Sequence, residues 1–343
     1  MARAVALFSG GLDSTLAILT ILKQGIDVNA LAFLTPFNTS ISGKSLYMTN
    51  GAAFSHERGF DIQIRHLEET FIDMVKNPKF GYGKNMNPCI DCRILMLKEA
   101  KLFMDETGAD FIITGEVLGQ RPMSQRRDTL NRIDREAGVK GYILRPLSAK
   151  LLDVTIPEAG GIVSRDVLHD FRGRSRKPQI DLAREFRLMH YPAPAGGCLL
   201  TEPIFSHKLK DLLAHNQDSG VRDIALLKVG RHFRFSPECK IIVGRDKKEN
   251  VILESLAVSS DCMITIEGYG SPTTLVSGAI NDEALRIGAS LCARYSDAKE
   301  LPYVQAQVIS QRGTSRIGVS RANNEIADAL RIEKTRKNPR VKA

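Results

Sequence analysis

This sequence lacks long apolar stretches, a cationic leader segment and a large complement of cysteines. Its longest apolar stretches, such as 4–8 and 30–34, are only a few residues each, whereas a membrane-spanning helix needs about 20. The chain does not begin with a basic segment followed by an apolar core, so we expect no signal peptide. We also expect no membrane-spanning segment, and we predict a cytoplasmic protein. Six cysteines in 343 residues are too few for a disulfide scaffold, so their spacing is informative about metal or redox chemistry.

Acidic residues are scarce where the chain is most basic. The net charge is +9, yet residues 1–120 carry 11 Lys/Arg against 13 Asp/Glu, while 121–205 carry 15 against 10 and 206–343 carry 22 against 16. The last ten residues hold five positive charges and no acid. Positive charge in patches suits a polyanionic partner, and a solvated basic surface with a disordered tail is the alternative.

The first 150 residues alternate short apolar strands with amphipathic helices, which predicts an α/β fold with a doubly wound parallel sheet. We expect strands at 4–8, 28–34, 61–67 and 110–114, and helices at 13–24 and 91–107. A second, smaller α+β domain is expected from strand-like runs at 224–229, 239–244, 262–267, 273–276 and 303–309 and a helix near 281–293. The predicted organisation is therefore a catalytic domain over 1–205, a linker at 206–221, a second domain over 222–330 and a basic tail at 331–343.

The most informative motif follows the first strand. A glycine pair at the start of a helix lets backbone N–H groups approach phosphate oxygens, and neighbouring hydroxyls add donors; here these residues are Ser9, Gly10, Gly11, Asp13, Ser14 and Thr15. The GK[ST] of a Walker loop is missing. The segment instead resembles the PP-loop (SGGxDS) of the adenine nucleotide alpha-hydrolase family. That resemblance implies a HUP-like fold, cleavage of ATP to AMP and pyrophosphate, and a role for Asp13 in holding Mg²⁺.

Two further segments agree with this family. Phe33 ends the second strand, where such enzymes flank adenine, although a core phenylalanine is an equal alternative. The segment 114–121 follows a strand and resembles the family's second nucleotide loop, at the sheet edge where ligands bind. Its candidates for nucleotide contact are Thr114, Gly115, Gln120 and Arg121.

Three cysteines are candidates for chemistry. Cys89 and Cys92 form a CxxC at a helix start, and Cys198 follows two glycines. A zinc site needs four closing ligands, and Cys239, Cys262 and Cys292 lie in runs typical of buried thiols. Three thiolates suit a [4Fe-4S] cluster with one iron open to sulfide; a persulfide and disulfide mechanism without a cluster is the alternative.

The combination of a PP-loop, a PCxxC and a distant GGC resembles the ThiI-like tRNA thiolation enzymes over residues 1–205. This implies that ATP adenylates a uridine in tRNA, after which sulfur displaces AMP, with catalytic roles for Asp13, Cys89, Cys92 and Cys198. The sulfur donor would be sulfide or the persulfide of a cysteine desulfurase. Two alternatives remain: a cluster-free 2-thiouridylase, and a non-catalytic RNA-binding factor that binds nucleotide.

Basic segments supply candidates for RNA contact, because arginines near phosphates position RNA. In the first domain they are Arg126, Arg127, Arg172, Arg174, Arg176 and Lys177. In the second domain Arg231 and Arg234 alternate with Phe233 and Phe235, a pattern that suits stacking on RNA or, alternatively, a β-rich core. Residues 222–330 resemble the NFACT-R domain, a predicted RNA-binding module.

Overall fold

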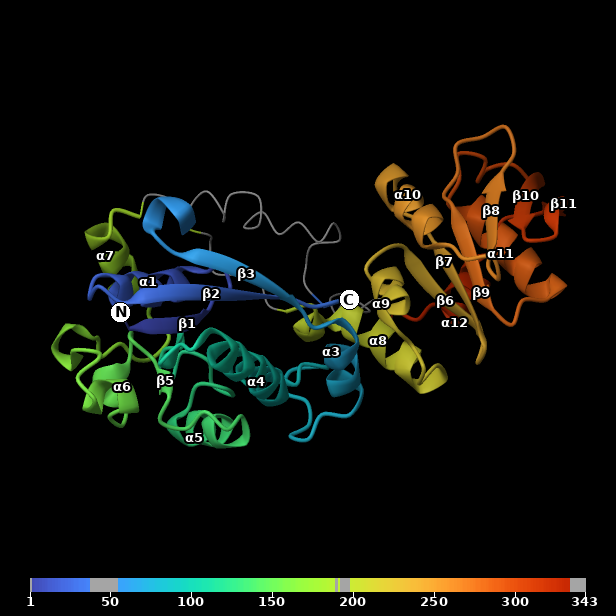
Figure 1. Cartoon of the computed structure of the whole chain (residues 1–343). Coiled ribbons are helices and arrows are strands. Elements are labelled where there is room, and N and C mark those ends of the chain that lie inside the picture. The colour runs from blue at the N-terminus through green and yellow to red at the C-terminus, as the bar shows by residue number, and fades with distance from the viewer. Residues whose placement is uncertain (1, 38–54, 189–190, 192–197, 334–343) are drawn as a thin grey trace, which may run out of the picture. The chain divides into compact units, whose positions relative to one another are not determined.

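The short apolar runs of the N-terminal part form one parallel sheet (Figure 1). The computed structural model describes residues 2–37, 55–188, 191 and 198–333, and the chain divides into two units, 1–198 and 199–343. The first sheet runs in the order β3-β2-β1-β4-β5, with β1 (Arg3–Leu7), β2 (Asp27–Leu34), β3 (Asp61–His66), β4 (Phe111–Thr114) and β5 (Ile143–Leu144). All its pairings are parallel, which confirms the predicted fold class.

Helices cover both faces of this sheet, which explains why its central strands are continuously apolar. The helices are α1 (Leu12–Leu22), α3 (Glu68–Lys76), α4 (Cys89–Thr107), α5 (Arg127–Glu136), α6 (Ile156–Ala159) and α7 (Lys177–Glu185), with 3₁₀ turns at Ala149–Leu151 and Arg165–Val167. Ala4 and Ala6 pack on the α1 side with Ile18. Val5 packs on the opposite side with Leu97 of α4.

The second unit contains an antiparallel sheet in the order β11-β10-β8-β9-β7-β6. Its strands are β6 (Arg231–Ser236), β7 (Cys239–Val243), β8 (Cys262–Ile266), β9 (Thr274–Gly278), β10 (Val304–Ser310) and β11 (Gly313–Val319). Its helices are α8 (Pro203–His215), α9 (Val221–Leu227), α10 (Lys247–Leu256), α11 (Asp282–Arg294) and α12 (Asn324–Leu330), after a 3₁₀ turn at Leu199–Thr201.

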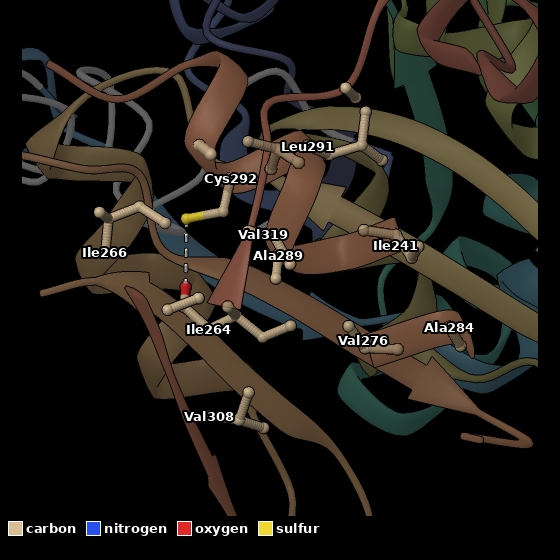
Figure 2. Packing of buried hydrophobic residues seen from close by; sticks show 14 of the residues in the cluster. Ile241, Ile264, Ile266, Val276, Ala284, Ala289, Leu291, Cys292, Val308 and Val319 are labelled. Carbon is tan, nitrogen blue, oxygen red and sulfur yellow. Dashed lines mark hydrogen bonds between the residues drawn. The ribbon is translucent and has the colours of Figure 1, made fainter. Parts of the chain in front are cut away.

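Helix α11 packs closely on one face of this sheet, as Figure 2 shows. A Cβ added to Gly288 would lie 3.0 Å from side-chain atoms of Ile264 and Val276, so the helix approaches the strands more closely than a larger residue would permit. Cys292 is fully buried in this layer and its thiol donates to the carbonyl of Pro272 at 3.3 Å. Cys239, Cys262 and Cys292 are all core residues.

Two expectations about the second domain were wrong. Residues 224–229, predicted as a strand, lie largely in α9, because a short apolar run fits either element and Asp223 accepts a hydrogen bond from Gly220 N at the start of this helix. The expected linker at 206–221 contains most of α8, whose Leu209 and Leu212 are buried. Strands β6 and β11 and helices α10 and α12 were not among the predicted elements.

The last described residues close one edge of the second sheet. Arg331 forms a β-bridge with Phe233, and Ile332 N donates to the carbonyl of His232 at 3.0 Å. Lys208, nearly fully buried, pairs with Glu333 at 2.8 Å. Of the predicted basic tail, residues 334–343 lie outside the described part of the chain. Within the described ranges, no helix has the length and apolar character needed to cross a membrane.

The packing of α4 gives a direct test of this fold. Replacing Leu97, fully buried against the sheet, with alanine removes apolar contacts and leaves a cavity. We expect the free energy of unfolding to fall by about 2–5 kcal/mol, measured by urea denaturation. Leu102→Ala on the same helix, where the side chain is 57% exposed, should change it by less than about 0.5 kcal/mol. Equal losses in the two variants would contradict the orientation of α4.

Candidate functional site

The PP-loop connects β1 to α1 and leaves the start of the helix open. Gly10 has φ 71°, a conformation that favours glycine. The hydroxyls of Ser14 and Thr15 donate to the carbonyl of Gly11 at 2.9 and 3.1 Å, and the Ser9 and Ser14 hydroxyls lie 3.2 Å apart. Gly11 caps the helix and has no side chain to bond the first N–H groups of α1, while Gly11 N itself donates to Ser9 Oγ at 3.4 Å. These N–H groups and the helix dipole therefore favour an anion such as phosphate.

Asp13 lies at the end of a chain of amide hydrogen bonds. Gln120 donates to Asp13 Oδ2 at 2.7 Å, and Gln179 of α7 donates to Gln120 Oε1 at 3.0 Å. The other carboxylate oxygen, Asp13 Oδ1, is buried and has no hydrogen-bond partner in the described part of the chain. Mg²⁺ takes carboxylate and phosphate oxygens. An oriented carboxylate with one unsatisfied oxygen beside a phosphate cradle therefore fits Mg²⁺.

The second nucleotide loop touches the PP-loop so closely that only glycine fits at one position. A Cβ on Gly115 would lie 2.5 Å from the carbonyl carbon of Asp13 and would also overlap Ser14 N. The two loops follow β1 and β4, neighbouring strands at which the chain order reverses, and ligands of such sheets bind at this edge. The predicted role of Gly115 in close backbone approach thus has a specific partner, the PP-loop itself.

A buried ion network holds the second nucleotide loop, and no local sequence pattern marks it. Arg145 donates to both oxygens of Asp134 at 2.7 and 2.9 Å and to Glu116 Oε2 at 3.0 Å, while Arg93 Nε lies 3.3 Å from Glu116 Oε1. Burial alone would raise the pKa of Glu116, but the Arg145 and Arg93 guanidiniums hold it below its ordinary value.

The CxxC motif lies beside the nucleotide loop. Cys89 begins α4, and Arg93, next to Cys92, reaches Glu116 of the loop. Burial raises the pKa of Cys92 to about 12, with the charges of Cys198 and Cys89 adding to the rise and Arg93 and Arg121 opposing it. Cys92 therefore lies within electrostatic range of both Cys89 and Cys198.

The three cysteines have the donor chemistry of an iron–sulfur site, because thiolates are the usual cluster ligands. Burial raises the pKa of the Cys89 thiol, and Arg121 and Arg93 oppose this; Cys198 is exposed. Within the described ranges no three His, Cys, Asp or Glu side chains are grouped as a metal site. Residues 192–197, which include the glycines before Cys198, lie outside those ranges. The thiol chemistry of the three cysteines suits a cluster, the described side chains are not grouped to hold one, and the cluster stays a prediction.

The basic segment 172–177 lies next to the nucleotide loop. Leu118 and Arg172 form a parallel β-bridge, and Gly173 N donates to the carbonyl of Leu118 at 2.8 Å. Arg172, Arg174 and Lys177 are exposed, and Arg176 is half-buried. Arg126 is exposed too, as is Arg127, which lies 3.4 Å from Asp153. Exposed arginines therefore flank the predicted nucleotide site.

Three other candidates have neighbours that favour structural roles. Phe33 is partly buried against the core on the α4 side of the sheet. Arg234 forms an ion pair with Asp211 at 2.5 Å, and Phe233 is fully buried. Arg231 donates to the carbonyl of Gly244 at 3.1 Å. We therefore assign the alternating basic and aromatic pattern of β6 to a strand with a buried aromatic face.

The fold and site define the first unit as a PP-loop nucleotide-binding domain, and comparisons with known proteins make this more specific. Residues 1–154 match the family described as thiamine biosynthesis protein (ThiI), and residues 230–330 match the NFACT protein RNA binding domain. These matches confirm both predicted resemblances.

Individual relatives fall in the same group. The chain is 26% identical over 174 residues to a tRNA-specific 2-thiouridylase MnmA of Trichlorobacter lovleyi, covering 48% of each chain. It is 31% identical over 163 residues to a probable tRNA sulfurtransferase of Lysinibacillus sphaericus, covering 46% of this chain and 38% of the relative. The chain is also similar to a solved 4-thiouridine synthetase–RNA complex with bound ATP, at 20% identity and a TM-score of 0.34. This match covers 55% of this chain and 52% of the synthetase. The chain spans about half or less of the length of these curated relatives.

The contact between the two nucleotide loops generates a prediction. Gly115→Ala should push the loops apart, because the added methyl group overlaps PP-loop backbone, and should weaken ATP binding about tenfold, or about 1.4 kcal/mol. Isothermal titration with a non-hydrolysable ATP analogue measures this. Gly138→Ala serves as control: its φ of +71° makes the substitution strained, yet nothing lies within 4 Å of the added Cβ, so ATP affinity should not change. Full affinity in Gly115→Ala would contradict the assigned site.

Proposed function

We propose that this chain is an ATP-dependent tRNA sulfurtransferase that adenylates a uridine carbonyl and replaces its oxygen with sulfur. The observation that carries the proposal is the meeting of three features at one sheet edge. These are the open PP-loop with its unsatisfied Asp13 oxygen, the loop at 114–121, and the Cys89–Cys92 helix joined to that loop through Arg93 and Glu116. Nucleotide binding alone does not need thiols at this place. The relatives named as tRNA sulfurtransferases support the substrate.

The chemistry proceeds in two displacements. The backbone N–H groups at the start of α1 hold the phosphates. Asp13, oriented by Gln120, would hold Mg²⁺, which would neutralise phosphate charge. The uridine carbonyl oxygen attacks the α-phosphorus, and pyrophosphate leaves with the electrons of the broken bond. A sulfur nucleophile then attacks the activated ring carbon, and AMP departs with the original oxygen. Arg121 is exposed and lies close enough to Cys89 and Cys92 to oppose the rise of their pKa, and in this proposal it contacts the nucleotide phosphates.

For delivery of sulfur we assign Cys89, Cys92 and Cys198 as ligands of a [4Fe-4S] cluster, which would supply an open iron able to hold sulfide. A second candidate is a cluster-free mechanism, favoured by the exposure of Cys198 and its electrostatic contact with Cys92. There, one cysteine carries a persulfide, its outer sulfur goes to the ring carbon, and a second thiolate closes a disulfide that an external reductant must reopen. Sulfide is the proposed donor for the cluster, and the persulfide of a cysteine desulfurase, which passes its outer sulfur to the cysteine, is the proposed donor for the cluster-free mechanism.

The nucleotide chemistry is tested by Asp13→Asn. Loss of the metal-binding charge should lower the rate of ATP cleavage by at least about 10²-fold. The rate is measured by chromatography of α-labelled ATP after incubation with tRNA. The wild-type products should be AMP and pyrophosphate. Asp27→Asn, an exposed position on β2, should retain full activity. Formation of ADP and phosphate by the wild type would refute the proposed reaction.

The cysteines are tested one at a time by serine substitution. Cys89→Ser, Cys92→Ser and Cys198→Ser should each abolish thiolation of tRNA, read by mass spectrometry of its nucleosides, while Cys262→Ser should keep it. Anaerobically purified wild type should be brown, with about four irons per chain, and should lose activity in air. Iron-free protein that thiolates at full rate with persulfide would instead establish the cluster-free mechanism.

A further inference from the structure

The second unit contains a cavity with a strongly basic lining. It has a volume of about 450 Å³ and lies where the end of α11 meets the segment between β11 and α12; its lining residues are Arg294, Tyr295, Arg321, Ala322, Asn323 and Asn324. Two of the six are arginines and none is acidic. A cavity with this lining attracts an anion.

Arg294 is fixed in position by part of its guanidinium only. It donates to the carbonyl of Ala322 at 2.9 Å and to Asn324 Oδ1 at 2.6 Å. A guanidinium has five N–H donors. These two bonds leave one N–H on each terminal nitrogen, and Arg294 Nε is buried with no hydrogen-bond partner in the described part of the chain. The side chain is therefore oriented by the protein while donors remain for a ligand, which reduces the ordering cost of binding.

Arg321 is the more adjustable of the two arginines. It donates to the carbonyl of Lys299 at 2.8 Å and lies 3.4 Å from Glu300 Oε2. Its side chain is 51% exposed and that of Glu300 is 76% exposed, so solvent screens this pair and it contributes little. An incoming anion can therefore compete for Arg321 at small cost.

Tyr295 has little ring surface left for a base. The guanidinium carbons of Arg231 and Arg294 lie 4.4 and 5.8 Å from its ring centroid, so cation–π contacts already use this ring. Arg231, predicted as a direct RNA contact, thus packs on Tyr295, which lines the cavity. The lining offers donors for a phosphate without an apolar slot for a nucleobase, which favours a backbone phosphate over a mononucleotide.

We propose that this cavity binds a phosphodiester group of RNA through Arg294 and Arg321. Guanidinium groups match phosphate oxygens in geometry and charge, and the carboxamides of Asn323 and Asn324 line the same cavity. The surrounding sequence, residues 206–343, has an excess of six positive charges. The identity of the phosphate carrier rests on the proposed function, whereas the anion site rests on the cavity alone. In this arrangement the second unit grips the RNA backbone without reading its sequence.

Fluorescence anisotropy with the full chain and a labelled, unmodified tRNA transcript tests the proposal across a series of KCl concentrations. Arg294→Gln and Arg321→Gln should each weaken binding about five- to tenfold and reduce the slope of log affinity against log salt by about 0.9. Arg294→Lys keeps the positive charge but loses the paired N–H donors of the guanidinium, so its tRNA affinity should lie between those of the wild type and Arg294→Gln. Arg316→Gln removes the same charge from β11, outside the cavity and 2.7 Å from Glu267, and should lose less than about twofold.

Each result decides the proposal. Unchanged affinity and slope in the Arg294 and Arg321 variants would overturn it, with thermal shift checking that both variants fold. Stabilisation of the wild type by inorganic phosphate but not of Arg294→Gln, with tRNA affinity unaffected, would assign the cavity to a free anion and overturn the RNA assignment. If the wild type fails to form AMP or to thiolate tRNA, yet binds tRNA through Arg294, the proposed function fails and this inference stands.

Discussion

The buried guanidinium of Arg145 is the interaction on which the first unit most depends. Its fork joins Asp134 of α5 to Glu116 of the nucleotide loop, and Glu116 in turn reaches Arg93 on the cysteine helix. Removing one partner of such a buried pair leaves an uncompensated charge, at a cost of about 3–5 kcal/mol. The network therefore sets the positions of the nucleotide loop and the cysteine helix together, so that neither can move without breaking the same ion pairs.

Local chemistry in the sequence was enough for the frame of the first unit and for much of its site. Continuous apolar strands identified the parallel sheet because both faces are covered, and the SGGLDS segment identified the phosphate cradle because glycines and a helix start must coincide there. Gln179 could not be recognised, since its contact with Gln120 spans 59 residues and nothing in its neighbourhood marks it. The same holds for Glu116, whose partners come from two other elements.

The second unit was harder to predict because its apolar runs are short. Ile224, Leu226 and Leu227 fit a strand or one face of a helix equally well, and only the tertiary contacts of α9 decide between them. Arg234 looked available for RNA because Asp211, its partner, lies 23 residues earlier in a segment expected to be a linker. Both errors arise from long-range pairing, which sequence periodicity does not encode.

The three residues Arg331–Glu333 belong to the second domain. They extend the edge of β6 and neutralise buried Lys208, whereas the match to the RNA-binding family stops at residue 330. A domain cut after residue 330 would leave buried Lys208 with its hydrogen bonds to the carbonyls of Leu227 and Gly230 but without its counter-ion Glu333. It would also expose the edge of β6, which is a template for self-association. The second compact unit thus extends beyond the matched segment 230–330 at both ends, from α8 to Glu333.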